Sequence, residues 1–430
     1  MPARFDPAGP LRGALRPPPD KSISHRAALI AAMAEGRSLV LNYLDSADTR
    51  STLTAVKRLG ARIEEERRNG GLELAIRGVG LRRPADCRID VGNAGTLLRL
   101  LPGWLAGGEG GHWTLDGDES IRHRPVDRIA EPLGRMGARV LCRDGRLPPL
   151  RVEGARLHGI RYELPVASAQ VKSCVLLAGM LARGPTTVVE PAQSRDHTER
   201  MLEAVGAEVD VLGTEITVRR PVALEPLEMS VPGDFSSAAF HIVAALVVPG
   251  SELAVERVGL NPTRTGLLDV LARMGAHIEV TEESFQGREP VGRMVASHGK
   301  LQATEVRGED VPLAIDELPL VALAACFAEG ETVIRDAAEL RRKESDRVAS
   351  VAEALNAVGG NVEPTVDGMV VTGTGGLRGG RISAHGDHRI AMLGAVAGLA
   401  SREGVEVDGI EAAAISYPGF EADLASLSSR

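Results

Sequence analysis

The chain has 430 residues, with 50 Lys and Arg residues against 58 Asp and Glu residues, and its formal net charge at pH 7 is −8. Hydrophobic residues make up 43% of the chain and charged residues 25%. This composition is typical of globular proteins and excludes a disordered chain. The acidic balance argues against a nucleic-acid-coating protein, which usually has a basic excess.

The cysteines and the apolar segments indicate in which cellular compartment the protein is expected. None of the four cysteines belongs to a CxxC pair, so neither a zinc ribbon nor a thioredoxin site is indicated. The first residues, MPARFDPAGP, lack the apolar core of a signal peptide. The longest apolar runs, such as Leu318–Ala328, span about 11 residues, whereas a membrane span needs about 20. We expect a soluble, cytoplasmic protein.

One pattern recurs six times along the chain: an apolar helix rich in small residues, then a glycine, then a β-branched strand. A second marker, a glycine that ends an amphipathic helix in the left-handed conformation, follows the first in five copies. The spacing of about 72 residues indicates six structural repeats. The first set of glycines is Gly36, Gly110, Gly184, Gly250, Gly330 and Gly404, and the second is Gly60, Gly137, Gly206, Gly275 and Gly359.

The repeats predict an α/β fold in which helices cover sheets. The first helix of each repeat is apolar nearly all round, which is typical of a buried helix. No GxGxxG follows a predicted strand, which disfavours a Rossmann domain. Pro-rich joints precede the first and fourth of these helices. We therefore predict two lobes of three repeats each, 17–232 and 233–430, with residues 1–16 returning to the second lobe.

The segments that enter the six apolar helices contain most of the unusual polar residues. A helix N-terminus offers free N–H groups and a positive dipole end, which suits an anion. Six equivalent helix starts predict a ligand with more than one anionic group. The segments are DKSISHR (Asp20–Arg26), GNAGTLLR (Gly92–Arg99), SAQVKS (Ser168–Ser173), GDFSS (Gly233–Ser237), IDELP (Ile315–Pro319) and HGDHR (His385–Arg389).

Each candidate has a plainer structural interpretation. Lys21, Ser22 and Arg26 share one helix start, which favours an anion site over a surface lysine. Gly95 admits close approach of a ligand to the backbone, or forms an ordinary tight turn. Ser168 offers a hydroxyl to a ligand or caps its helix.

Two further segments carry ionisable groups. In RRKESDR, Lys343 and Glu344 are four and three residues before Arg347, so we expect the three to share a helix face; the alternative is a solvated face. Asp316 enters an apolar helix, where we expect its pKa to rise toward that of a general base, unless it serves as an N-cap.

We expect no metal and no cofactor. His385, Asp387 and His388 in one segment, and Asp196 and His197 in another, are metal-ligand residue types. Neither segment has three ligands at a known spacing. The neighbouring Arg195 and Arg389 are better suited to an anion.

Taken together, the motifs resemble those of the 3-phosphoshikimate 1-carboxyvinyltransferase family, also called 5-enolpyruvylshikimate-3-phosphate synthases. The matching segments follow the family's order, and SAQVK, RDHTE and NPTR resemble its second class. They are DKSISHR, LDSADT, GNAGTLLR, RHRP, SAQVKS, SRDHTERML, IDELP, RRKESDR and GDHRIAM.

The resemblance implies a two-lobed inverted α/β barrel of six βαβαββ repeats that closes on its substrates. It implies transfer of the enolpyruvyl group of phosphoenolpyruvate to the 5-hydroxyl of shikimate 3-phosphate, with release of phosphate, in the shikimate pathway of aromatic amino-acid biosynthesis. It gives Asp316 and Glu344 the proton transfers, assisted by Lys21 and Lys343.

The resemblance also implies the substrate ligands. Those of shikimate 3-phosphate are Lys21, Ser22, Arg26, Ser168, Ala169, Gln170, Arg195, Asp316 and Lys343. Those of phosphoenolpyruvate are Lys21, Gly95, Arg124, Gln170, Arg347 and Arg389. An Arg fork suits a planar carboxylate or a phosphate, whereas Lys acts as a point charge.

The sequence departs from the family pattern at two positions. Pro19 stands where many relatives have Gly, and Ile415 stands where many have a phosphoenolpyruvate-binding Lys. Gly95 leaves room for glyphosate, so the resemblance implies a glyphosate target that is sensitive to the herbicide. A monomer is the default expectation, because no interface motif is visible.

Two rival functions stay open. A UDP-N-acetylglucosamine enolpyruvyltransferase shares the six-repeat fold, but it typically carries a Cys in the loop that is Gly117–Arg122 here, where none occurs. A non-enzymatic phosphometabolite-binding protein does not need Asp316 and Glu344 together.

Overall fold

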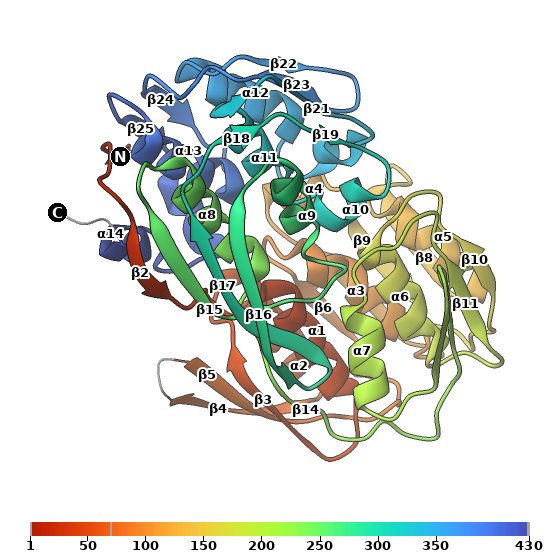
Figure 1. Ribbon diagram of the computed structural model, residues 1–430. Helices are drawn as coiled ribbons and strands as arrows, with labels where there is room; N and C mark the ends of the chain where they lie inside the picture. Colours follow the sequence, from red (N-terminus) through yellow and green to blue (C-terminus); the bar gives the residue numbers. More distant parts are fainter. Residues whose placement is uncertain (1, 69–70, 428–430) are drawn as a thin grey trace. The chain divides into compact units, whose positions relative to one another are not determined.

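The computed structural model describes residues 2–68 and 71–427, which form two compact units (Figure 1). The N-unit comprises Pro19–Val231 and Phe285–Glu289, and the C-unit comprises the described residues of Met1–Pro18, Pro232–Ser284 and Pro290–Arg430. The outer ends of the predicted lobes, residues 1 and 430, lie outside the described residues.

One sheet pattern recurs in both units. Two parallel strands lie at one edge, and two antiparallel strands follow. In the N-unit the pattern occurs three times. These sheets are β14 (Glu228–Ser230), β3 (Arg37–Tyr43), β5 (Gly71–Arg77) and β4 (Arg62–Arg68); β6 (Cys87–Asp90), β7 (His112–Asp116), β9 (Leu147–Glu153) and β8 (Arg139–Arg143); and β10 (Arg161–Glu163), β11 (Thr186–Val189), β13 (Glu215–Val218) and β12 (Val209–Leu212).

The C-unit has two sheets of the same pattern and one of three strands, besides the short pair β18 (Leu301–Gln302) and β20 (Ala328–Glu329). They are β2 (Arg12–Leu15), β15 (Glu252–Gly259), β17 (Glu289–Ser297) and β16 (His277–Gln286); β19 (Glu305–Val306), β21 (Glu331–Ile334), β23 (Met369–Thr372) and β22 (Val362–Pro364); and β24 (Gly380–Ser383), β25 (Val405–Asp408) and β1 (Ala3–Phe5).

Six buried helices form the centre of these units, as their all-round apolar sequences predict. All thirteen residues of α8 are buried, because its Ala and Ser side chains let neighbouring helices approach closely. The helices are α1 (Lys21–Met33), α3 (Gly95–Ala106) and α6 (Ala169–Gly179) in the N-unit, and α8 (Phe235–Val247), α11 (Leu318–Ala325) and α13 (His388–Ala400) in the C-unit. Each unit has its own hydrophobic core around its three helices.

A second helix follows in each repeat, and shorter helices fill some connections. The second helices are α2 (Ala47–Arg58), α5 (Asp127–Met136), α7 (His197–Ala204), α9 (Gly266–Arg273), α12 (Arg347–Ala357) and α14 (Phe420–Leu427). The shorter elements are α4 (Glu119–Arg122), α10 (Asp310–Ala314) and the 3₁₀ turns Ala338–Arg342 and Ile410–Ile415. All the glycine markers have positive φ, for example 92° at Gly36 and 113° at Gly137, so the predicted left-handed helix ends are confirmed.

The strands that precede α1 and α8 are exchanged between the units. Strand β2 pairs in parallel with β15 of the C-unit, and β14 pairs in parallel with β3 of the N-unit. The chain therefore passes from one unit to the other at Pro18–Pro19 and again at Val231–Pro232. Among the described residues, no helix combines the length and apolarity that crossing a membrane requires.

Candidate active site

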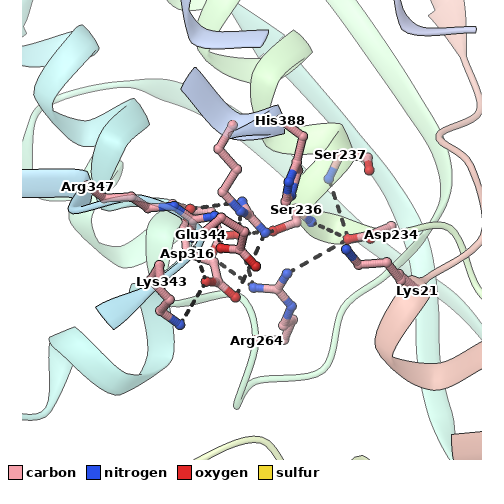
Figure 2. A network of polar contacts seen from close by, with 12 residues as sticks. Lys21, Asp234, Ser236, Ser237, Arg264, Asp316, Lys343, Glu344, Arg347 and His388 are labelled. Atoms are coloured by element: carbon pink, nitrogen blue, oxygen red, sulfur yellow. Dashed lines mark hydrogen bonds and ion pairs between the residues drawn. The ribbon is translucent and has the colours of Figure 1, made fainter. Parts of the chain in front are cut away.

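In the C-unit, Asp316 lies where three cations converge at the entry to α11 (Figure 2). Its Oδ1 lies 3.1 Å from Lys343 Nζ and 3.3 Å from Arg347 Nη1, and its Oδ2 lies 3.8 Å from Arg389 Nη2. The Asp316 carbonyl also accepts a 2.8 Å hydrogen bond from Arg389 Nη1. Asp316 is therefore not the N-cap of α11, because Glu317 holds that position.

Arg347 is the hub of this network and is 1% exposed. Its Nε donates to Asp387 Oδ2 at 2.8 Å, and its Nη2 donates to Glu344 Oε2 at 2.6 Å. Burial alone lowers the pKa of Arg347, but the charges of Asp387, Glu344 and Asp316 hold it above its usual value. A permanently charged guanidinium thus links both predicted proton-transfer carboxylates.

The expectation that Lys343, Glu344 and Arg347 share a helix face is wrong. Helix α12 begins only at Arg347, because the Asp346 carboxylate accepts a 3.1 Å hydrogen bond from Ala349 N and caps the helix there. Lys343 follows a 3₁₀ turn and has extended backbone. The three side chains meet through the cluster around Asp316 instead.

A second buried cluster adjoins Asp316. It contains the predicted ligand Arg389, together with Glu317, Arg264 and Ser236, which are not among the predicted site residues. Glu317 is 0% exposed and accepts two hydrogen bonds from Arg264 Nη1, at 3.0 and 2.9 Å. Arg389 Nη1 also contacts Glu317, at 3.4 Å, and its Nη2 donates to Ser236 Oγ at 2.6 Å. The signal available in the sequence was a second carboxylate directly after Asp316, entering the same apolar helix.

In the N-unit, Lys21 opens α1 beside a buried carboxylate. Asp20 caps the helix by accepting from Ile23 N at 2.8 Å. Lys21 Nζ lies 3.2 Å from Asp48 Oδ2, and its side chain keeps 19% exposure. Asp48 belongs to the LDSADT segment, whose partner in space the sequence did not reveal. Ser22, the next residue, is partly exposed, and its carbonyl accepts from Arg26 Nη1 at 3.1 Å.

Arg26 is buried among hydroxyl groups and near another arginine. Its Nε donates to Thr198 Oγ1 at 2.8 Å, and its Nη2 donates to Ser173 Oγ at 3.0 Å. Burial, and next the positive charge of Arg195, lower the pKa of Arg26 to about 10. Two arginines held close enough to repel each other are suited to a polyanion.

Gly95 and Arg124 meet at the start of α3. Arg124 Nη2 donates to Asn93 Oδ1 at 2.8 Å and to Ser120 Oγ at 3.1 Å. A Cβ atom at Gly95 would lie 2.7 Å from Arg124 Nη1, which is closer than side-chain packing allows. The glycine therefore makes room for this guanidinium against the helix N-terminus.

Helix α6 brings the SAQVKS residues to the same unit. Ser168 caps the helix, accepting from Val171 N at 3.4 Å, and Ala169 is its first residue. Gln170 accepts from Arg99 Nη1 at 2.9 Å and donates to Thr96 Oγ1 at 3.3 Å. Arg99 is thus a further candidate that the sequence analysis left unassigned.

The segments considered for a metal have other partners. Asp387 binds Arg347 and caps α13 by accepting from Arg389 N at 2.9 Å. His197 Nδ1 lies 2.8 Å from Glu289 Oε1. Among the described residues, no group of three or more His, Cys, Asp or Glu side chains is arranged to hold a metal ion.

Each unit therefore presents a distinct chemical set. The C-unit places two carboxylates, Asp316 and Glu344, on one buried guanidinium, an arrangement suited to proton transfer. The N-unit collects cations and hydroxyls at helix starts, an arrangement suited to phosphate and carboxylate groups.

Comparison with known proteins shows the family of the chain. A family model described as EPSP synthase (3-phosphoshikimate 1-carboxyvinyltransferase) matches residues 5–424. The chain is 51% identical over 427 residues to the 3-phosphoshikimate 1-carboxyvinyltransferase of Thermus thermophilus, covering 99% of this chain and 98% of the relative. It is 49% identical over 421 residues to that of Desulfitobacterium hafniense, covering 97% and 95%.

Two solved structures share the architecture. The EPSP synthase from Acinetobacter baumannii superposes with a TM-score of 0.86 at 40% identity, covering 99% of this chain and 98% of that chain. The enolpyruvyl transferase NikO from Streptomyces tendae has a TM-score of 0.78 at 20% identity, covering 99% and 96%, and so shows a common fold. The predicted two-lobed enolpyruvyltransferase-like fold class is confirmed.

Proposed function

Because the chain belongs to the EPSP synthase family, whose members transfer the enolpyruvyl group of phosphoenolpyruvate to shikimate 3-phosphate, we propose which of its residues perform each step. The transfer releases phosphate and is a step of the shikimate pathway. The assignment rests on one observation above the others: Asp316 and Glu344 both contact Arg347.

The anionic groups of the substrates are bound by cations and helix starts. Shikimate 3-phosphate is bound by Arg26 and Arg195, together with further residues. A bound phosphate relieves the repulsion between the two arginines. Phosphoenolpyruvate is bound by the cations around Gly95 and Asp316. The remaining ligands are Lys21, Ser22, Ser168, Ala169, Gln170, Asp316 and Lys343 for the first substrate, and Lys21, Gly95, Arg124, Gln170, Arg347 and Arg389 for the second.

Asp316 is the base that removes the proton of the 5-hydroxyl. Lys343 and Arg347 contact its carboxylate and hold it in place. Glu344 is the acid that protonates the methylene carbon of phosphoenolpyruvate. The hydroxyl oxygen then bonds to the adjacent carbon and gives a tetrahedral adduct.

The second half of the reaction reverses one proton transfer. Glu344, now a carboxylate, removes a proton from the new methyl group, the double bond re-forms, and the carbon–oxygen bond to phosphate breaks. The leaving phosphate takes up the proton that Asp316 had removed from the 5-hydroxyl, which restores the Asp316 carboxylate, while Lys21 and Lys343 stabilise the charge of the phosphate.

The test measures phosphate release with phosphoenolpyruvate and either shikimate 3-phosphate or UDP-N-acetylglucosamine as acceptor. We expect release only with shikimate 3-phosphate. Release only with the UDP-sugar would reject the acceptor-site residues. No release with either acceptor from folded protein would favour a phosphometabolite-binding protein and would direct attention to Pro19 and Ile415. The Ile415 side chain packs against the hydrophobic core and offers no charge to phosphoenolpyruvate.

We further propose that the protein acts as a cytoplasmic monomer without nucleic-acid or membrane partners. Its four cysteines are all free, which fits a reducing compartment. Its net charge of −8 does not favour binding to nucleic acid. Light scattering after size-exclusion chromatography tests the monomer, and a molar mass near 90 kDa, twice that of the chain, would reject it. The chain mass is 45.4 kDa.

A further inference from the structure

A buried ion triad lies directly behind the Arg26 site in the N-unit. Lys172, on α6, is 1% exposed, and its Nζ lies 2.7 Å from both Glu190 Oε2 and Glu199 Oε1. The same ammonium donates to the Ser194 carbonyl at 3.3 Å. Glu190 in turn accepts a short hydrogen bond from Ser194 Oγ. The triad thus joins α6, α7 and the segment between β11 and α7.

Lys172 itself, and two of the residues that its ammonium contacts, Glu199 and Ser194, are next in sequence to residues of the Arg26 site. Lys172 precedes Ser173, and Glu199 follows Thr198; both hydroxyls accept from Arg26 and contact each other at 2.6 Å. Ser194 precedes Arg195, whose charge acts on Arg26. A shift of Lys172, Glu199 or Ser194 therefore moves a neighbour that contacts or repels Arg26, and Glu190 acts through Lys172 and Ser194.

The segment between β11 and α7, which carries Arg195, is not packed against other residues on every side. A cavity of about 480 Å³ is lined by Gln193, Ser194 and Asp196, together with Lys172 and Glu199. The backbone that carries Arg195 therefore borders open space. The polar contacts of Ser194 with Lys172 and Glu190 help to hold this backbone in place.

We propose that Lys172, Glu190 and Glu199 form a positioning triad that sets the separation of Arg26 and Arg195 and so determines affinity for the phosphate-bearing acceptor. The inference rests on the proposed function, in which these two arginines bind shikimate 3-phosphate. Stability alone is a weak reason for such a triad, because buried ion pairs often contribute no more than apolar residues of similar volume. Hydrogen bonds, which have a fixed direction, can instead hold the neighbouring side chains in defined positions.

The decisive experiment measures the dissociation constant of shikimate 3-phosphate by titration calorimetry, without phosphoenolpyruvate. In Lys172→Met we expect binding weaker by roughly 10- to 100-fold, the scale for loss of a supporting contact or a misplaced group. At saturating substrates, kcat stays within about threefold, because the triad does not touch the reacting atoms. Arg161→Met is the matched control: it removes an exposed pair with Glu215 between β10 and β13 of the neighbouring sheet and leaves binding unchanged.

A second variant covers a failure of Lys172→Met to fold, since that change leaves two carboxylates buried without their cation. Lys172→Met with Glu190→Gln and Glu199→Gln removes every charge of the triad, so no carboxylate is left buried without a cation. We expect melting near that of the wild type and acceptor binding still weakened by 10-fold or more. Wild-type affinity in either folded variant would overturn the proposal.

A double-mutant cycle distinguishes positioning from general damage. If Lys172 acts through Arg195, the Lys172→Met change weakens binding by under about threefold when Arg195→Met is already present, because coupled residues are not additive. Additive losses would overturn the triad's role while leaving the site intact. If Arg195→Met itself binds shikimate 3-phosphate normally, the proposed acceptor site is wrong, and the triad proposal is rejected with it.

Discussion

Arg347 and Asp387 form a two-bonded ion pair inside the C-unit: Nε to Oδ2 at 2.8 Å and Nη2 to Oδ1 at 3.2 Å. Their side chains are 1% and 0% exposed. Asp387 also accepts from Ser345 Oγ at 3.0 Å and caps α13. One carboxylate therefore fixes both a helix start and the guanidinium that holds Asp316 and Glu344.

Replacement of Asp387 by Asn is expected to lower the free energy of unfolding by about 3–5 kcal/mol, because it leaves Arg347 buried with part of its counter-charge removed. Denaturant titration measures the loss. Asp408→Asn is the control: Asp408 pairs with Arg381 in the same two-bonded geometry, but Arg381 is exposed and Asp408 is partly exposed, so we expect a far smaller loss than in Asp387→Asn. Equal losses in the two variants would contradict this account.

Asp316→Ala is expected to leave the fold intact and to lower turnover at least ~10²-fold, the usual contribution of a positioned acid or base. The physical reason is that the Asp316 carboxylate contacts both Lys343 and Arg347, and the alanine side chain removes the group that accepts the proton. Turnover is measured as phosphate release at saturating substrates, with circular dichroism to verify folding. Asp310→Ala, which breaks an exposed pair with Arg273, serves as the control. Near-normal turnover in Asp316→Ala would contradict the assignment of Asp316 as the base.

Gly95→Ala is expected to raise the KM for phosphoenolpyruvate and to weaken glyphosate inhibition, because the new methyl group displaces the Arg124 guanidinium, whose Nη1 lies 2.7 Å from the Cβ position. Wild-type protein is expected to be glyphosate-sensitive, and an inhibition constant in the millimolar range would reject that. The control is Gly134→Ala in α5, where a Cβ meets nothing within 4 Å. If both variants match the wild type, Arg124 is not held as described.

Acid is expected to destabilise the protein partly through His241. Burial lowers the pKa of His241 to about 3, so in the folded state the ring stays neutral when the unfolded chain takes up a proton below pH 6.5. The unfolded state then binds more protons, and the free energy of unfolding falls as the pH drops from 6.5 toward 3, by up to about 1.4 kcal/mol per pH unit.

His241→Gln isolates this contribution, because Gln does not titrate and can reach the Tyr417 hydroxyl, which lies 3.0 Å from His241 Nε2. Denaturant titrations at several pH values between 7 and 4 compare the two proteins. We expect a shallower loss of stability in the variant. An unchanged slope would mean that His241 does not titrate on unfolding in this range.

Local sequence signals predicted the framework well. The buried helices and the helix-ending glycines depend on neighbouring residues, so an all-round apolar run and a Gly at its end were sufficient. The expected helix face of Lys343 and Arg347 was wrong for an equally local reason: the capping residue Asp346 starts a new helix between them.

Contacts between residues far apart in the chain could not be predicted from the sequence. Glu317 and Arg264 are 53 residues apart and meet only because two helices of the C-unit pack together. Asp48 likewise reaches Lys21 from another helix. The roles of the predicted site residues came from the family resemblance, since charge and spacing alone left a helix cap or a solvated face as equal alternatives.

The pairing of the first strand, β1, with the last strand, β25, has a consequence for synthesis on the ribosome. Ala3 of β1 pairs with Val407 of β25, so the first strand emerges long before its partner. At about 5–20 residues per second, it waits roughly 20–80 s. The N-unit, nearly complete by Val231, can fold during that interval, while the leading residues stay unpaired. A nascent chain stalled shortly before β25 should therefore expose its N-terminus to a protease that the finished protein resists.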